Sequence, residues 1–108
     1  MEGFWTVQFE GMEGRGGGVI VLLRNHVYGG DSGLHYTGTY VDEDGQLSAD
    51  VLVHEFLPGT GNVLGIKGDF RLVLKGTVAG AVVEGTAKLV GQAGVGLAFK
   101  LKRISNLF

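Results

Sequence analysis

The sequence predicts an all-β protein, an antiparallel barrel of seven or eight strands in a single domain that spans residues 1–108. Short apolar segments recur along the whole chain, and turn residues separate them at short spacing. Glycine accounts for 21 residues, well over double its ordinary share of about 7%. Glycines between and within strands are typical of tight hairpins, bulges and sharp bends. Closure removes exposed sheet edges, and about eight strands make a barrel that its own side chains fill or that holds one small ligand.

The first four strands are expected at Phe4–Glu10, Gly18–Arg24, Val27–Tyr28 and Leu34–Val41. The first ends at the turn Gly11–Gly14, and the glycine-rich turn Gly29–Gly33 separates the third from the fourth. The fourth alternates with the period of two that is typical of a half-buried strand. One of its faces carries Leu34, Tyr36, Gly38 and Tyr40, and the other carries His35, Thr37, Thr39 and Val41.

The last four strands are expected at Gln46–Leu57, Asp69–Lys75, Ala81–Val90 and Val95–Ile104. A loop that begins Pro58-Gly59-Thr60-Gly61-Asn62 separates the first two of these, and Gly91–Gly94 separates the last two. One short helical turn is expected at Asn62–Ile66, because the spacing of Val63 and Ile66 fits a helix. No other segment combines a helical apolar stripe with a cap. A sandwich of two sheets is the alternative to the closed barrel.

The second strand is apolar on both faces, whereas a barrel strand needs only one apolar face. Its outer face should therefore be covered. One hypothesis is a two-fold homodimer, in which the same surface of a second copy covers it. The candidate dimer residues are Val19, Ile20, Val21, Leu22 and Leu23. The other hypothesis is that the loop around Pro58 covers this face.

Composition and charge exclude several classes of protein. The net charge is −2, and the only basic concentration is Lys100, Lys102 and Arg103, so we expect no direct nucleic-acid binding. The absence of cysteine excludes disulfides and thiolate metal sites and fits a reducing compartment. The first residues lack the pattern of a secretory signal, and the longest apolar run, Val19–Leu23, is too short to span a membrane. We therefore expect a cytoplasmic protein with no membrane contact.

No constellation of residues predicts catalysis, a metal or a cofactor. The glycine-rich segments Gly14–Gly18 and Gly59–Gly65 lack the helix and the Gly-Lys-Ser/Thr signature of a phosphate loop. The three histidines, His26, His35 and His54, are isolated in sequence, without metal-ligand spacing. Asp31, Ser32 and His35 lie too close in the chain to align as a triad. Glu55 and Glu84 are interpreted as outward-facing rather than as paired acids. We therefore expect a binding protein and not an enzyme.

The turn Asp42-Glu43-Asp44-Gly45 is the best candidate for a binding site. Asp-Gly is a strong hairpin signal, so the turn has a plain structural interpretation in which the acidic residues aid solubility. Alternatively, Asp42, Glu43 and Asp44 form a compact anionic tip that meets a basic partner. A second candidate site is the barrel interior, where Leu34, Tyr36, Tyr40 and Phe99 would line a cavity for a small apolar ligand.

Trp5 and Arg103 are candidates for closing the barrel, because first and last strands meet when a barrel closes. Arg103 would then lie over the Trp5 ring and seal one end by cation–π stacking. Lipocalin-like barrels are similar at this point, with a Gly-x-Trp opening strand and a basic residue from the last strand on the tryptophan. The alternative is an ordinary core tryptophan and a solvated arginine.

The whole chain resembles the GrlR-like negative regulators of type III secretion, which are small lipocalin-like β-barrel proteins of bacteria. The resemblance rests on the order and spacing of several segments. These are the Gly3-Phe4-Trp5-Thr6-Val7-Gln8-Phe9 opening, the glycine-rich turn before Val19-Ile20-Val21-Leu22, the Gly29-Gly30-Asp31 turn, the Tyr36-x-Gly38-x-Tyr40 strand, the acidic turn and Phe70–Gly76.

The resemblance implies a cytoplasmic homodimer that represses transcription through protein contact. In the founding regulator, a surface Glu-Asp-Glu-Asp motif engages and sequesters a transcriptional activator. Asp42, Glu43 and Asp44 match this motif, with Gly45 in the remaining position. The family barrel can also hold a lipid-like ligand. The leading prediction is therefore a GrlR-like regulator that captures a basic activator, and the alternative is a carrier of a small apolar ligand.

Overall fold

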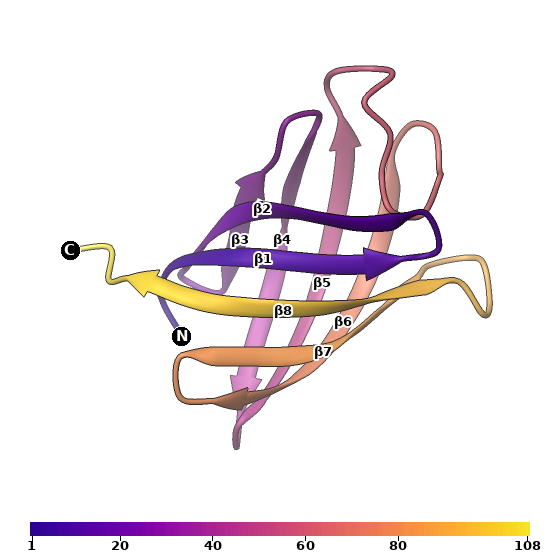
Figure 1. Ribbon diagram of the computed structural model, residues 1–108. Coiled ribbons are helices and arrows are strands. Elements are labelled where there is room, and N and C mark those ends of the chain that lie inside the picture. Colours follow the sequence, from indigo (N-terminus) through magenta and orange to yellow (C-terminus); the bar gives the residue numbers. More distant parts are fainter.

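The computed structural model describes all 108 residues as a closed antiparallel barrel, in which each strand pairs with the next and β8 pairs with β1 (Figure 1). The eight strands are β1 (Gly3–Gly11), β2 (Gly14–Leu23), β3 (His26–Gly30), β4 (Leu34–Glu43), β5 (Gln46–Glu55), β6 (Phe70–Ala79), β7 (Val82–Leu89) and β8 (Gly96–Ser105). The predicted closed barrel of seven or eight strands is confirmed with eight, and the sandwich alternative is wrong. No helix is present, so none is long and apolar enough to cross a membrane.

Two expected turns are parts of strands. β2 begins at Gly14 and not at Gly18, and β3 continues through Gly29 and Gly30. A side chain at Gly29 would collide with the Val19 carbonyl oxygen of the neighbouring strand. Here glycine permits the close approach of two backbones within a bent sheet. Sequence alone does not distinguish a glycine in this role from a glycine in a turn.

The expected helical turn at Asn62–Ile66 is also wrong. This segment contains a hydrogen-bonded turn, in which the Gly65 amide donates to the Asn62 carbonyl at 3.1 Å. The Asn62 side chain replaces further helical hydrogen bonds, because its Oδ1 accepts from the amides of Leu64 and Ile66 at 3.0 and 3.3 Å. An asparagine that bonds to the following amides favours a turn over a helix.

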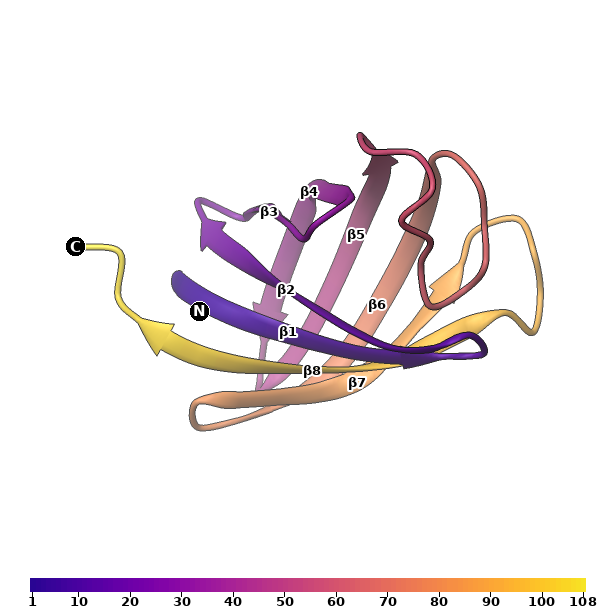
Figure 2. The same ribbon diagram turned by 45° about the horizontal axis from the view of Figure 1, so that its top comes forward.

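The two ends of the barrel differ. One end holds both chain termini and the short turns after β2, β4 and β6, and we call it the terminal end. The other end holds the turns after β1, β3 and β7 together with the long connection 56–69, and we call it the loop end. Figures 1 and 2 show both termini on the same side, with connection 56–69 on the opposite part of the barrel.

The core lies inside the barrel and contains no buried polar or charged residue. The strands alternate inward apolar residues with outward residues, as in β4, where Leu34, Tyr36 and Tyr40 are buried. Val63 and Leu64 of connection 56–69 join the same cluster. The core is therefore closed at the loop end by a non-strand segment.

Candidate functional site

The acidic residues lie on a tight hairpin at the terminal end. Asp44 and Gly45 are the central residues of the β4–β5 turn, with φ angles of 51° and 76°, and Glu43 pairs with Gln46 beside them. Positive φ at both central residues is typical of a type I′ turn, which matches the twist of the two strands. The Val78 amide donates to the Gly45 carbonyl at 2.8 Å, so the turn is also tied to β6. This hydrogen-bonded turn exposes the side chains of Asp42, Glu43 and Asp44.

The charges of this tip are largely uncompensated. Asp42 Oδ2 lies 3.4 Å from the N-terminal amine of Met1, whereas Glu43 and Asp44 form no ion pair. Glu2 adds another carboxylate that, like Asp42, acts on Tyr40, and sequence reasoning missed it because Glu2 is far from both residues in the chain. Burial, followed by the negative charges of Asp42 and Glu2, raises the pKa of Tyr40. The β4–β5 turn therefore presents a local concentration of negative charge suited to a cationic partner.

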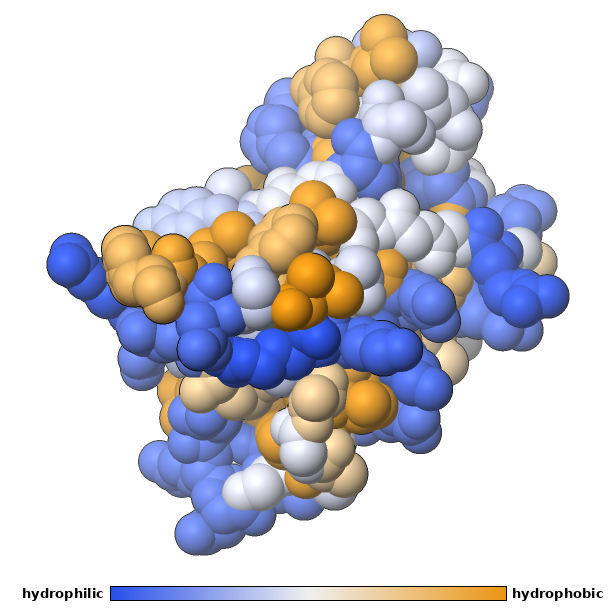
Figure 3. Space-filling view, turned by 60° about the vertical axis from the view of Figure 1, so that its left-hand side comes forward, coloured by the Kyte–Doolittle hydropathy of each residue, from blue (hydrophilic) through white to orange (hydrophobic).

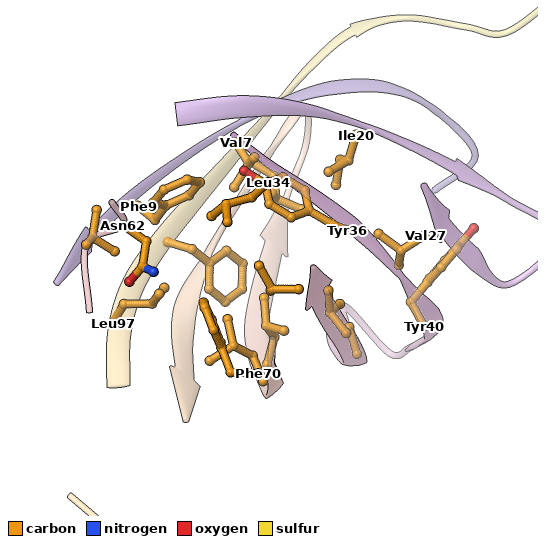
Figure 4. Close-up of a pocket in the computed structure, with 18 of the residues that line it drawn as sticks. Val7, Phe9, Ile20, Val27, Leu34, Tyr36, Tyr40, Asn62, Phe70 and Leu97 are labelled. Carbon is orange, nitrogen blue, oxygen red and sulfur yellow. The ribbon is translucent and has the colours of Figure 1, made fainter. Parts of the chain in front are cut away.

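The barrel interior holds an apolar cavity of about 100 Å³ that is partly open to the surface (Figure 4). Of the 21 residues that line it, 20 are hydrophobic, and the exception is Asn62. The four residues expected to face the interior, Leu34, Tyr36, Tyr40 and Phe99, are all among them. Ligand pockets usually measure about 300–1,000 Å³, so this cavity is too small for a lipid without movement of its walls.

Connection 56–69 is the part of the cavity wall that is not a strand. Val63 and Leu64 line the cavity, and the Val63 carbonyl accepts the Glu13 amide at 2.8 Å. Near the start of the connection, the Gly33 carbonyl accepts the amides of Phe56 and Leu57 at 3.0 and 3.2 Å. Displacement of Val63 and Leu64 by a larger ligand would break the contact with Glu13.

The predicted dimer residues on β2 divide between the two faces of the sheet. Ile20 and Leu22 are 7% and 1% exposed and point into the barrel, so their assignment to a surface is wrong. Val19, Val21 and Leu23 point outward, because side chains alternate along a strand. Connection 56–69, which contains Pro58, lies at the loop end, and Val19 is 42% exposed. The hypothesis that this connection covers the outer face of β2 is therefore also wrong.

The outward β2 residues belong to a wider apolar surface. Val21 pairs with Phe4 of β1 on one side and with Tyr28 of β3 on the other, so their side chains form a row across three strands. Ile104 extends this surface on β8, where it is 52% exposed. Figure 3, which brings this side of the molecule forward, shows hydrophobic side chains gathered there beside a hydrophilic band. We call Phe4, Val19, Val21, Leu23, Tyr28 and Ile104 the outer apolar patch.

Trp5 and Arg103 lie opposite each other where β1 and β8 close the barrel. The Arg103 guanidinium carbon lies 5.5 Å from the Trp5 ring centroid, so the two side chains stack at the terminal end. Trp5 is 1% exposed. The alternative of a solvated arginine away from the tryptophan is wrong.

The remaining polar candidates have structural partners. The Asp31 carboxylate accepts the amides of Gly33 and Leu34, each at 3.0 Å, and also the Tyr36 hydroxyl. Glu84 lies 3.5 Å from Lys100 and not beside Glu55. The histidines are isolated in sequence, but the fold brings His35 and His54 directly opposite each other on β4 and β5.

No protein-family model matches this chain, and no curated protein matches it in sequence. The geometry of the structure defines three candidate sites. They are the exposed carboxylates Asp42, Glu43 and Asp44, which we call the acidic tip, the outer apolar patch and the apolar cavity.

Proposed function

We propose that this protein is a dimeric, cytoplasmic barrel that captures a basic protein partner through Asp42, Glu43 and Asp44. In the way that the resemblance to GrlR-like regulators implies, the partner is a transcriptional activator, and its capture lowers transcription. The observation that carries the proposal is the acidic tip, in which three adjacent exposed carboxylates stand on a rigid turn and only Asp42 has a cationic neighbour. Exposed charges of this kind steer association and are screened by salt, so capture should weaken as ionic strength rises.

The test is a pull-down from lysate of the native host with the full chain as bait. The variant is Asp42→Asn/Glu43→Gln/Asp44→Asn, which removes the charges and keeps side-chain size. The matched control is Glu10→Gln/Glu13→Gln, which removes exposed carboxylates elsewhere on the barrel. We expect a basic DNA-binding protein to be captured by the wild type and by the control, and to be lost with the acidic-tip variant. Equal capture by the wild type and the variant would refute the site.

The dimer is supported by the outer apolar patch. Patches of this kind on a monomer mark an interaction surface, and a two-fold axis allows one patch to cover its own copy. The test is multi-angle light scattering of the wild type at micromolar concentration, which should give twice the mass of the 11.4 kDa chain. Val21→Lys should give the monomer mass with the fold intact, whereas Thr77→Lys, exposed on β6 away from the patch, should remain a dimer. A monomeric wild type excludes this part of the proposal.

The second candidate function is a carrier of a small apolar ligand, favoured by the cavity lining. The cavity of about 100 Å³ would have to expand, for example by displacement of Val63 and Leu64, the two hydrophobic lining residues outside the strands. Native mass spectrometry of the protein purified from its host distinguishes the two functions. A retained small molecule, with the acidic-tip variant unaffected, favours the carrier, and a captured basic protein favours the regulator.

A further inference from the structure

His35 and His54 form a cross-strand pair on the outside of the barrel at the loop end. They are partners in the register of β4 and β5, and their ring centroids are 4.6 Å apart with an interplanar angle of 34°. His35 is exposed, and the His54 side chain is 42% exposed. Two imidazoles are thus presented to solvent on one rigid hairpin, at the end opposite to the acidic tip.

Each ring has a neighbour that restricts its orientation. His54 Nδ1 lies 2.9 and 3.0 Å from the two carboxylate oxygens of Asp69, and one of these oxygens also accepts the Glu55 amide at 3.2 Å. His35 lies nearly parallel to the Phe56 ring, with centroids 6.1 Å apart.

The contact between His54 and Asp69 is one that metal-binding histidines commonly make. A histidine that binds a metal usually donates its other ring N–H to a carboxylate, which fixes the tautomer and the direction of the free nitrogen. Asp69 occupies Nδ1 of His54 in this way and leaves Nε2 free. Imidazole suits Zn²⁺ and Cu²⁺, whereas Mg²⁺ and Ca²⁺ prefer oxygen ligands.

We propose that His35 and His54 bind a divalent transition-metal cation, Zn²⁺ or Cu²⁺, through Nε2 of His54 and one ring nitrogen of His35. No cluster of three or more potential ligands is present on this chain, so water or a group of a bound molecule completes the coordination. The site is therefore open. A histidine coordinates a metal through a neutral ring nitrogen, so the cation competes with protons at both rings.

The test is isothermal titration of the full chain with ZnCl₂ and with CuCl₂ at neutral pH. We expect one ion per chain, with Cu²⁺ bound more tightly than Zn²⁺. His35→Ala and His54→Ala should each weaken binding at least tenfold, because each removes one of two ligands. His26→Ala is the matched control, since His26 is exposed and stacks on Tyr28 away from the pair, and it should bind as the wild type does.

Asp69→Asn tests the orienting role of the carboxylate. We expect a loss of roughly 10–100-fold in affinity with an unchanged circular dichroism spectrum. Amide NMR signals of the wild type give a second readout, since paramagnetic Cu²⁺ should broaden residues around His35 and His54 first. Binding that His35→Ala and His54→Ala leave unchanged, or Cu²⁺ broadening centred on His26, would overturn the proposal.

Discussion

The Arg103 guanidinium lies over the Trp5 indole and also holds the first and last residues of the barrel together. Its carbon is 5.5 Å from the ring centroid, and one of its nitrogens donates to the Glu2 carbonyl at 2.6 Å and to the Asn106 side chain at 2.7 Å. The Trp5 indole N–H donates to the Met1 carbonyl at 3.1 Å. One cation therefore joins the N-terminal segment, the closing strand and the residues that follow it.

Arg103→Ala should destabilise the protein by about 2 kcal/mol. A cation–π contact contributes about 0.5–2 kcal/mol depending on its exposure, and the lost hydrogen bonds add to this. The measurement is urea unfolding followed by the fluorescence of Trp5, the only tryptophan of the chain. Lys102→Ala, the outward neighbour on β8, is the control and should change stability little. An unchanged midpoint and an unchanged emission spectrum for Arg103→Ala would show that the contact contributes nothing.

Tyr36→Phe should destabilise the protein by about 1.5–3 kcal/mol, the usual range for a hydrogen bond to a charged group. The buried Tyr36 hydroxyl donates to the Asp31 carboxylate, which organises the turn before β4. Urea unfolding at neutral pH measures the effect. Tyr40→Phe is the comparison, because the Tyr40 hydroxyl has no such carboxylate partner. A smaller loss for Tyr36→Phe than for Tyr40→Phe would contradict this role.

The contribution of Tyr36 should also depend on alkaline pH. Burial, and then the hydrogen bond and charge of Asp31, raise the pKa of Tyr36 far above its ordinary value of 10.0. A group with a raised folded pKa contributes fully below its unfolded pKa, and its contribution is lost as the pH rises toward the folded pKa. The stability difference between wild type and Tyr36→Phe should therefore be constant below about pH 10 and shrink above it. Unfolding curves between pH 7 and 11 measure this, and a difference that grows with pH would contradict it.

The barrel could be predicted from the sequence because period-two alternation survives in nearly every strand. Leu34, Tyr36 and Tyr40 all face inward as that alternation requires. The inward direction of Ile20 and Leu22 could not be predicted in the same way. Because residues 19–23 of β2 are apolar on both faces, the sequence does not show which of them face the barrel interior. The covering of the loop end by Val63 and Leu64 also escaped prediction, since it depends on tertiary packing of a segment without periodicity.

The histidine pair could have been found from the sequence. Asp44-Gly45 is a two-residue hairpin signal, and such a turn fixes the register of the strands on both sides. That register places His35 opposite His54. The positions of Glu2 and Asp69 beside their partners could not be found in this way, because each comes from a different element of the folded barrel.

Gly85→Ala should destabilise the protein by about 1–3 kcal/mol, the usual cost of overpacking. A Cβ at Gly85 would collide with the Lys75 carbonyl oxygen of β6 and lie 2.5 Å from the Gly76 Cα, and backbone cannot give way as a side chain can. Gly17→Ala is the matched control, because its Cβ would meet only the Val7 carbonyl oxygen, at 3.3 Å. Thermal unfolding of both variants measures the difference. Equal melting temperatures would show that the β6–β7 pair can relax and that glycine is not required there.

Asp44→Ala should cost about 1–2 kcal/mol, whereas Asp44→Asn should be nearly neutral. Asp44 has a φ of 51°, a left-handed conformation that is unfavourable for most L-residues and that aspartate and asparagine tolerate. Urea midpoints of the two variants measure the difference, and equal midpoints would mean that the turn adopts another geometry. The distinction decides how the acidic tip is tested, because alanine would perturb the turn as well as the charge. If the asparagine-containing variant keeps wild-type stability and loses the partner, the loss is due to charge alone.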